Sequence, residues 1–461
     1  MSGHAALVMR DVPRQWTAST PEEFDALSTA HALKHCHVGL FDVDGGFREK
    51  RVPLAVARDY VHHGWSFIDA LPYWNAAEGC TQDLPFAGEP CGLDPTSVRP
   101  YPFETSSALV VADYTGPSRR LSARVKLGEQ VARAASLGFA VSASTELEFI
   151  VLDETAETLR KKAFSELITH AQHNRCWSGY MLATDAELLA EYEAVLAAGD
   201  VPLHHFCAEL GPGCLEIALP QRSVMHAADD AALGRLFTKA FFQRRGLTAS
   251  FMAKLSDDHP GLGGHPILSL FDLTSGAASF FDATRPHGLS QALHGFVAGV
   301  LAVLPEVTAL FAHTTNAYRR YAPGNWAPRT ATWGIENYTC GVRVVPGRAE
   351  DVRVEFRLPG ADMNPHASFA VLLAAGLDGI ERRLEPPPPC TTIGRDVGNE
   401  PGRRLPRGLL EAAETFATSA FARRHFGDSF VSHFAETRIR EAEEIRRHVS
   451  SFERARYLHT V

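Results

Sequence analysis

The sequence has no Cys-x-x-Cys pair, no run of basic residues and no apolar stretch long enough to span a bilayer. Its eight cysteines are scattered along 461 residues. A chain of this length can bury a large core without disulfides, so we expect free thiols in a reducing compartment. The net charge of -9 and the missing Lys/Arg-rich segments argue against nucleic acid as the main partner.

Membrane insertion and secretion are not expected either. The N-terminus has no basic segment followed by a long apolar stretch, so no secretory signal is predicted. The longest apolar run, 295–304, stops before Pro305 and indicates a buried helix. A hydrophobic content of 45% and a charged content of 21% are typical of globular proteins. We therefore expect a cytoplasmic protein that acts on small molecules.

Turn residues and composition divide the chain into a small β-rich part, 1–112, and a larger part, 113–461. Residues 37–48 are predicted to form two strands joined by a turn at 44–46, where Asp-Gly-Gly favours a tight reversal. Residues 75–105 are rich in proline and glycine and predict an irregular loop.

The larger part mixes strand and helix patterns, so the predicted fold class is α+β. Long and short strands are expected over 139–152 and 268–271. Helical periodicity is found over 122–137, 160–200, 227–252, 291–310 and 365–384, and again from 409 to the end.

Five glutamates and one histidine recur at strand-like spacing in the larger part. Side chains alternate faces along a strand, so the glutamates of S-T-E-L-E-F point the same way. The glutamates of C-A-E-L-G-P-G-C-L-E-I flank a Gly-Pro-Gly turn that folds two strands together. The candidate metal ligands are Glu146, Glu148, Glu209, Glu216, His265 and Glu355.

Each of these patterns, taken alone, is also typical of an antiparallel strand with one solvated face. Two of the strands are otherwise apolar, however, over 149–152 and 217–220. Like charges brought together on buried strands need a cation to be tolerated. Carboxylates with one imidazole suit hard divalent ions, so the combination predicts a site for Mg²⁺ or Mn²⁺.

Several blocks, in this order and spacing, resemble the glutamine synthetase family from about residue 36 to the C-terminus. S-T-E-L-E-F and C-A-E-L-G-P-G-C-L-E-I resemble its glutamate strands, and N-A-Y-R-R-Y-A-P-G-N-W-A-P its flap. R-V-E-F-R-L-P-G-A-D-M-N-P-H-A-S-F is very close to its C-terminal motif. The resemblance implies a small N-terminal β-grasp-like domain, 1–112, and a large catalytic domain, 113–461, whose antiparallel sheet lines the active site. It also implies stacked rings, most commonly dodecamers.

The resemblance further implies an ATP-dependent ligase that joins an amino-acid carboxylate to an amine through an acyl phosphate. Two to three Mg²⁺ or Mn²⁺ ions would bind per site. Glu148, Glu209 and Glu216 would hold one ion, and Glu146, His265 and Glu355 another. Two divalent ions would offset the repulsion between a carboxylate and the γ-phosphate of ATP.

Arginines would handle the anionic groups, because a guanidinium matches carboxylates and phosphates with two parallel hydrogen bonds. Asp42, in the small domain, would complete the amine site of a neighbouring subunit. By the same resemblance Gly261 and Arg320 would bind the amino acid, and Arg357 would face the activated carboxylate. Arg343 and Arg353 would contact the phosphates of ATP, and Ser269 would lie near its base.

The substrate pocket departs from the family pattern. Trp326 replaces a flap glutamate that helps to bind and deprotonate ammonium, and an indole offers only an apolar wall or a cation–π face. Tyr338 stands where the family has an arginine, and Ile267 and Pro260 replace a second histidine and an asparagine. These changes favour a γ-glutamyl amide ligase that uses an amine other than ammonia. The alternatives are an ordinary glutamine synthetase and a non-catalytic ring protein of this family.

Overall fold

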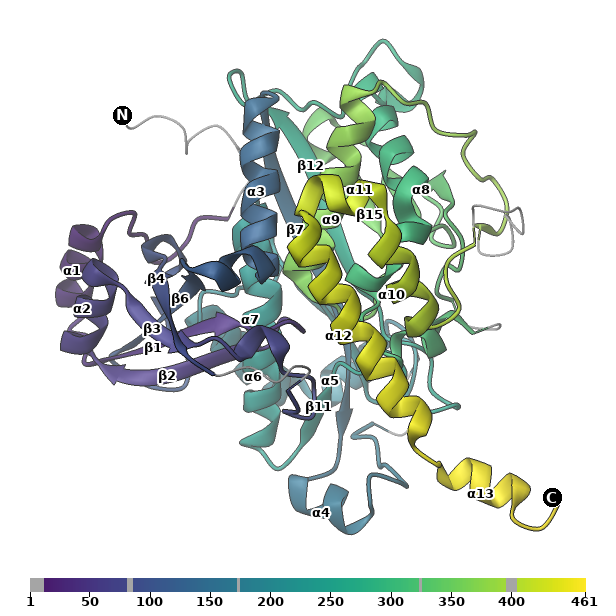
Figure 1. The fold of residues 1–461 in the computed structure, drawn as a ribbon, viewed down its shortest axis with the longest axis horizontal. Coiled ribbons are helices and arrows are strands. Elements are labelled where there is room, and N and C mark those ends of the chain that lie inside the picture. The colour runs from purple at the N-terminus through teal and green to yellow at the C-terminus, as the bar shows by residue number, and fades with distance from the viewer. Residues whose placement is uncertain (1–11, 81–85, 172–174, 323–325, 395–403) are drawn as a thin grey trace.

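The computed structural model describes residues 12–80, 86–171, 175–322, 326–394 and 404–461. The chain is built on two sheets, one of six strands near the N-terminus and one of nine strands in the rest. Helices alternate with the strands of both, so the mixed helix and sheet composition expected from the sequence is confirmed. In Figure 1 the first sheet lies to the left with its helices, and the second sheet runs through the middle of the molecule.

The first sheet has the strand order β2-β1-β6-β4-β3, with β5 beside β6. β1 and β2 form the predicted hairpin, and β6 pairs with β1 in parallel. Helices α1 and α2 contribute Phe24, Ala57 and Val61 to a core that they share with this sheet. The elements are α1 (Pro21–Ala30), β1 (His35–Phe41), β2 (Phe47–Pro53), α2 (Leu54–His63), β3 (Trp65–Ile68), β4 (Gly88–Leu93), β5 (Arg99–Pro100) and β6 (Ser107–Tyr114).

The prediction of irregular loop over 75–105 is wrong for part of that range. Residues 88–93 form β4, which pairs with β3 on one side and β6 on the other. The segment G-E-P-C-G-L has few good strand formers, so the neighbouring strands supply the hydrogen bonds that local propensity does not predict. Residues 81–85 lie outside the described part of the chain.

The second sheet is built around a 14-residue strand, β7 (Phe139–Leu152). The order is β13-β14-β15-β12-β7-β9-β8, with β10 and β11 also beside β7, and every pairing is antiparallel except that of β13 with β14. Its other strands are β8 (His205–Ala208), β9 (Cys214–Ala218), β10 (Arg222–Ser223), β11 (Thr248–Ser250), β12 (Gly264–Asp272), β13 (Trp333–Ile335), β14 (Val342–Val345) and β15 (Arg353–Phe356).

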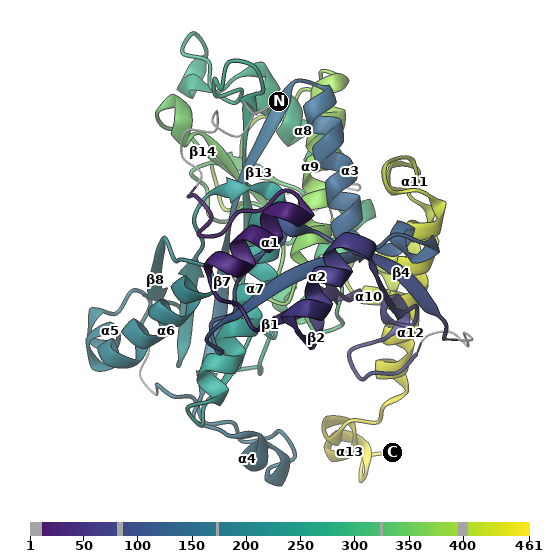
Figure 2. The same cartoon turned by 90° about the vertical axis from the view of Figure 1, so that its left-hand side faces the viewer.

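Helices pack on one face of this sheet. Phe149 of β7 contacts Phe242 of α7, with ring centroids 5.8 Å apart, and Figure 2 shows α7 running along β7. The helices of this part are α3 (Ala123–Ser136), α4 (Ala156–Lys161), α5 (Gly179–Thr184), α6 (Ala186–Ala198), α7 (Val224–Gln243), α8 (Gln291–Phe311), α9 (Pro365–Glu381), α10 (Leu409–Thr418), α11 (Ala420–Phe426), α12 (Asp428–Arg447) and α13 (Ser451–Tyr457).

Two helix predictions are too long. Over 160–200 the single predicted helix is replaced by the end of α4, by α5 and by α6. The helix is interrupted because Ala163 and Phe164 adopt positive φ and Thr169 forms a bridge with Leu152. The helix predicted over 227–252 ends at Gln243, after which Gly246 (φ +75°) turns the chain into β11. In both cases residues that periodicity assigns to helix pair instead with the end of β7.

Helix α8 carries the longest apolar run and is buried, as predicted. Among the described residues it is the one helix long and apolar enough to cross a membrane, but 78% of its most apolar window is covered by the rest of the molecule. It packs against α9 through Gly299 and Gly379, where a Cβ on either glycine would come within 2.1 Å of backbone carbonyl oxygen. α8 is therefore a central core helix.

Candidate active site

The register of β7 with its neighbours gathers the predicted ligands on one face of the large sheet. Glu148 stands opposite Glu216 of β9, and Glu146 stands opposite His265 of β12. The intervening Leu147 belongs to the apolar core on the other face. Because directly opposed residues in antiparallel strands share a face, these four side chains point away from the helices.

The same face continues through β12, β15 and β14. Ile267 stands opposite Glu355, and Glu355 stands opposite Arg343. Glu355 is 2% exposed and forms ion pairs with Arg343 (Nη1 to Oε2, 2.6 Å) and with Arg357. Sequence alternation predicted which residues share a strand face, and the strand order places the separate strands side by side.

Glu209 reaches the cluster through the predicted Gly-Pro-Gly turn. The Glu209 amide donates to the Cys214 carbonyl at 2.9 Å, which closes the turn between β8 and β9. Gly213 has φ +70°, and a Cβ there would lie 2.6 Å from the Val151 carbonyl oxygen. The turn brings a carboxylate oxygen of Glu209 within 4.8 Å of one from Glu216.

The electrostatics of this cluster call for a cation. Burial, followed by the charges of Glu146, Glu148 and Glu209, raises the pKa of Glu216 to about 9. Burial and the nearby Arg357 lower the pKa of His265 to about 3, so its imidazole is neutral at ordinary pH. Histidine binds metal through its neutral imidazole, and glutamate binds metal as the ionised carboxylate. A cation at the cluster would therefore take the place of the proton on Glu216.

Donor atoms also converge. Ligand atoms of Glu146, Glu216 and His265 all lie within 4.8 Å of one another. His265 is 2% exposed, and its Nε2 has no hydrogen-bond partner among the residues that the structure describes. The amide of Gly263 donates to Glu148 Oε2 at 2.7 Å and holds that carboxylate beside the histidine. The residues present therefore fit divalent ions, with Glu216 between the two groups of ligands.

The predicted amino-acid ligands lie together at one edge of the cluster. Arg320, on the short helix Ala317–Tyr321, is 4% exposed and donates from Nη1 to the Leu358 carbonyl at 2.8 Å. Gly261 packs directly on this side chain, since a Cβ there would lie 2.5 Å from Arg320 Cγ. Burial lowers the pKa of Arg320 from its usual value. A buried guanidinium beside a glycine is suited to fixing a carboxylate.

Tyr338 lies over the two arginines that flank Glu355. The guanidinium carbon of Arg343 is 3.8 Å from its ring centroid, and that of Arg357 is 5.3 Å away. Arg357 Nε also donates to the Tyr338 carbonyl at 2.9 Å. The tyrosine thus orients two cations through its ring and backbone without adding a positive charge.

Trp326 follows the undescribed residues 323–325 of the predicted flap. Its side chain is 61% exposed and is therefore not part of the core.

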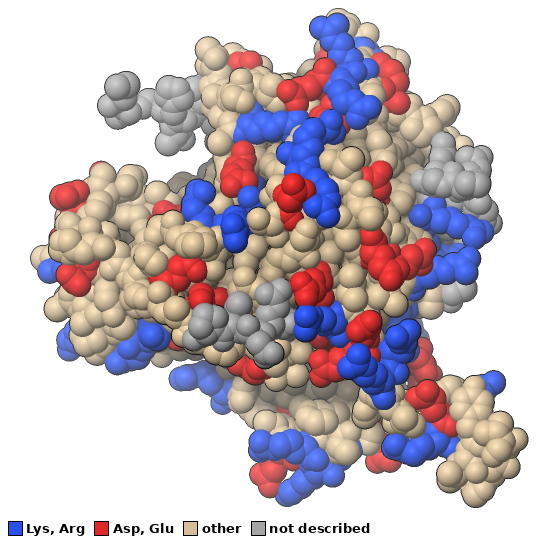
Figure 3. Space-filling model, in the orientation of Figure 1, with Lys and Arg blue, Asp and Glu red and all other residues tan. Residues whose placement is uncertain are grey.

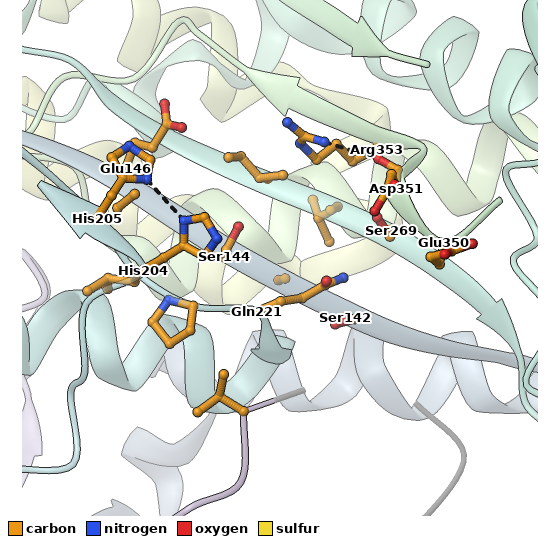
Figure 4. Close-up of a pocket in the computed structure, with 17 residues that line it drawn as sticks. Ser142, Ser144, Glu146, His204, His205, Gln221, Ser269, Glu350, Asp351 and Arg353 are labelled. Carbon is orange, nitrogen blue, oxygen red and sulfur yellow. Dashed lines mark hydrogen bonds between the residues drawn. The ribbon is translucent and has the colours of Figure 1, made fainter. Parts of the chain in front are cut away.

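A cavity of about 330 Å³ opens next to Glu146 (Figure 4). Ser269 and Arg353, two of the predicted ATP ligands, line it. Two of the three predicted nucleotide residues thus lie together at the edge of the carboxylate cluster, in a space near the lower end for a small-molecule site, whereas Arg343 pairs with Glu355 and does not line this cavity. Other polar residues of its wall are Ser142, Ser144, His204, His205, Gln221, Glu350 and Asp351.

The sequence analysis missed several residues of this region. His204 and His205 lie at the start of β8 with their Nδ1 atoms 3.0 Å apart. Cys207 stands opposite Glu216, and the Cys176 thiol donates to Glu209 Oε1 at 3.3 Å. Alternation along His205-Phe-Cys-Ala-Glu209 was a signal for Cys207, whereas nothing local pointed to Cys176.

Asp42 lies in the hairpin of the small sheet. It accepts hydrogen bonds from the Gly46 amide and from Arg48 Nε, each at 2.7 Å, and is 8% exposed. The hairpin contacts the larger part, since Asp44 pairs with Arg438 of α12 at 2.6 Å. Within one chain Asp42 therefore supports the turn, and its predicted role in a neighbouring subunit's site remains a prediction.

A sheet face bearing carboxylates, one neutral imidazole and buried arginines, beside a cavity, defines an enzyme that activates anionic substrates with divalent ions. The surface in Figure 3 mixes acidic and basic residues, as expected for a protein that acts on small molecules. A family model described as the catalytic domain of glutamine synthetase matches residues 120–457. The chain belongs to the glutamine synthetase family.

Relatives match over nearly the whole chain. It is 30% identical to a glutamate–isopropylamine ligase of a Pseudomonas species, over 93% of this chain and 95% of that protein. It is 32% identical to a gamma-glutamylethanolamide synthetase of Streptomyces coelicolor, over 90% of each. A solved structure of GmaS without ligand aligns with a TM-score of 0.82 and 25% identity, covering 94% of this chain and 99% of that one.

Proposed function

We propose that this protein is an ATP-dependent ligase that joins the γ-carboxylate of glutamate to an amine other than ammonia. One observation carries the proposal: the carboxylate and imidazole ligands converge on one sheet face, while the predicted flap carries an exposed tryptophan, Trp326, in place of a glutamate. The two relatives named above, a glutamate–isopropylamine ligase and a gamma-glutamylethanolamide synthetase, support the same class of acceptor.

The chain's own residues divide the work as follows. Arg320 holds the α-carboxylate of glutamate, with Gly261 leaving room for the substrate beside it. Arg357 faces the γ-carboxylate as it attacks the γ-phosphate of ATP, and Arg343 and Arg353 bind phosphate oxygens. The six ligands of the sheet face would hold divalent ions, which would neutralise the anionic charge of the two reactants. ADP leaves, and the resulting γ-glutamyl phosphate retains the activated acyl group.

The amine then attacks the acyl carbon, phosphate leaves, and a proton is lost from the nitrogen. An indole attracts an ammonium ion less strongly than a carboxylate does, and it can pack against carbon. Trp326 therefore favours amines that carry an apolar group. Tyr338 maintains the spacing of Arg343 and Arg357 through the cation–π contact at 3.8 Å.

The N-terminal part is proposed to be a β-grasp-like domain ending near residue 112, followed by the catalytic domain. Its mixed sheet, with a hairpin, a parallel pair and two helices, supports this. We further propose cytoplasmic rings of subunits, most commonly dodecamers, with Asp42 completing the amine site of a neighbour. Asp42 lies in the turn between β1 and β2, where it is 8% exposed.

The test is an acceptor panel with ATP, Mg²⁺ and glutamate. Phosphate release and the mass of the amide are measured for ammonia, methylamine, ethanolamine, isopropylamine and a longer alkylamine. The expected result is a kcat/KM for at least one substituted amine that exceeds that of ammonia by about tenfold or more, the scale of one to two buried methylene groups.

Two outcomes contradict the proposal in different ways. Ammonia as the best acceptor establishes an ordinary glutamine synthetase. Binding of ATP and Mg²⁺ with no turnover on any amine, and none with other amino-acid carboxylates, indicates a non-catalytic member of the family. Isothermal titration of ATP with Mg²⁺ separates this last case from a misfolded preparation.

A further inference from the structure

Two thiols lie against the carboxylates at one end of the metal-binding face. Cys207 Sγ is 3.8 Å from Glu216 Oε1, and Cys176 Sγ is 3.3 Å from Glu209 Oε1. Ligand atoms of Cys207, Glu209 and Glu216 all lie within 4.8 Å of one another. The two carboxylates are proposed Mg²⁺ ligands, but Mg²⁺ binds oxygen ligands and does not bind sulfur in proteins.

The fold fixes these thiols in place. Cys207 on β8 is paired in register with Glu216 on β9, and Glu216 is paired with Glu148 on β7, so the three side chains form one row. The amide of Trp177 donates to the Ala208 carbonyl at 2.7 Å and ties the segment carrying Cys176 to the end of β8. The three donors Cys207, Glu209 and Glu216 thus come from strand register and the β8–β9 turn, and Cys176 donates to Glu209 from an anchored segment.

Zn²⁺ accepts this donor set, because it binds both cysteine sulfur and carboxylate oxygen. Zinc binds four ligands tetrahedrally, with about 2.3 Å to sulfur and 2.0–2.2 Å to carboxylate oxygen, so neighbouring ligand atoms are about 3.3–3.8 Å apart. The distance of 3.8 Å between Cys207 Sγ and Glu216 Oε1 falls in this range, and a solvent molecule would complete the four ligands. The adjacent His265, 2% exposed and with an unpartnered Nε2, is a second observation that points to a cation at Glu216.

We propose that Cys207, Glu209 and Glu216 form a Zn²⁺ site that competes with Mg²⁺ for the two glutamates. Each thiol that coordinates releases one proton to solvent. Zn²⁺ held there withdraws Glu209 and Glu216 from the catalytic ions, so it inhibits amide synthesis and a chelator restores it. This inference rests on the proposed function in one respect, that these glutamates serve the ligase reaction.

The experiment uses the full chain after removal of metal with EDTA, and Co²⁺ as a spectroscopic substitute for Zn²⁺. Sulfur ligands give Co²⁺ an intense thiolate-to-metal charge-transfer band in the near ultraviolet, which oxygen and nitrogen ligands do not. We expect this band to saturate at one equivalent per subunit, to disappear when Zn²⁺ is added, and to be absent with Mg²⁺ alone.

Cys207→Ser is expected to abolish the band and to weaken Zn²⁺ binding, measured against a coloured chelator, by about tenfold or more, since even outer-shell changes cost about 10–100-fold. Cys176→Ser keeps the band, because it leaves the three donors in place. The matched control is Cys390→Ser, another half-buried thiol, whose Sγ contacts the Thr392 carbonyl and not the cluster; it leaves the band unchanged. Circular dichroism and a Mg²⁺ thermal shift verify that each variant folds.

A wild-type protein that binds Co²⁺ or Zn²⁺ without the sulfur band overturns the inference, and so does a band that persists in Cys207→Ser. The proposed ligase function fails separately. No turnover on any amine, with the band intact, contradicts the function alone. Turnover without the band contradicts the zinc site alone.

Discussion

The charge of Glu216 offers the sharpest test of the metal-binding face. In the metal-free protein the pKa of Glu216 is raised from 4.5 to about 9, by burial first and then by Glu146, Glu148 and Glu209. Between these two values the folded protein keeps a proton that the unfolded chain has lost. Stability of the metal-free protein therefore falls as the pH rises through this window.

The size of the effect follows from linkage. Each pH unit contributes about 1.4 kcal/mol, so the interval from the usual pKa of 4.5 to pH 7 gives an upper limit of about 3 kcal/mol. Neighbouring carboxylates share the proton, so we expect about 2–3 kcal/mol. Glu216→Gln removes this cost, and for a chain of this length about 1 kcal/mol changes Tm by about 1 °C.

The assay is differential scanning fluorimetry of EDTA-treated protein at pH 5, 7 and 8. Glu216→Gln is expected to raise Tm by about 2–3 °C at pH 7, more at pH 8 and hardly at pH 5, following the linkage slope. Saturating Mg²⁺ raises the Tm of the wild type more than that of the variant, because the variant lacks one of the six ligands. Glu187→Gln, at an exposed position of α6, is the matched control and changes neither value.

The reasoning is refuted if Glu216→Gln lowers the Tm of the metal-free protein at pH 7 or 8. That result shows that existing hydrogen bonds already satisfy the ionised carboxylate, so the cluster has no need of a cation. Equal Mg²⁺ stabilisation of variant and wild type also contradicts it.

Three other changes test the substrate side of the site. Trp326→Glu restores a carboxylate at the flap and is expected to raise kcat/KM for ammonia relative to isopropylamine by about tenfold or more. Trp326→Phe, the control, keeps the wild-type ratio. An unchanged ratio in Trp326→Glu contradicts the assignment of Trp326 to the amine site. Arg320→Lys keeps the charge but loses the two-pronged contact, so the KM for glutamate rises by about 10–100-fold with a smaller change for ATP, and a normal glutamate KM argues against the assigned role. Tyr338→Leu removes the ring over Arg343 and is expected to reduce kcat/KM for ATP by about two- to fivefold, the value of about 0.5–1 kcal/mol for one cation–π contact, whereas Tyr338→Phe is neutral; equal losses in both variants point to the hydroxyl instead.

The sequence alone predicted which residues share a strand face. Alternation with period two placed Glu146 and Glu148 on one face of a strand, and the Gly-Pro-Gly turn placed Glu209 near Glu216, because both are local consequences of backbone geometry. The long apolar run was correctly predicted to be a buried helix. The family resemblance supplied the roles of the arginines.

Only the tertiary structure decided which strands are neighbours. Register of β7 with β9 and β12 sets Glu148 against Glu216 and Glu146 against His265, and that pairing depends on contacts between segments more than 60 residues apart. The same long-range pairing made a strand of 88–93 and brought Cys176 and Cys207 to the carboxylates. Local patterns fix the direction of a side chain from its own strand, whereas its partner across the sheet is chosen by the packing of the whole chain.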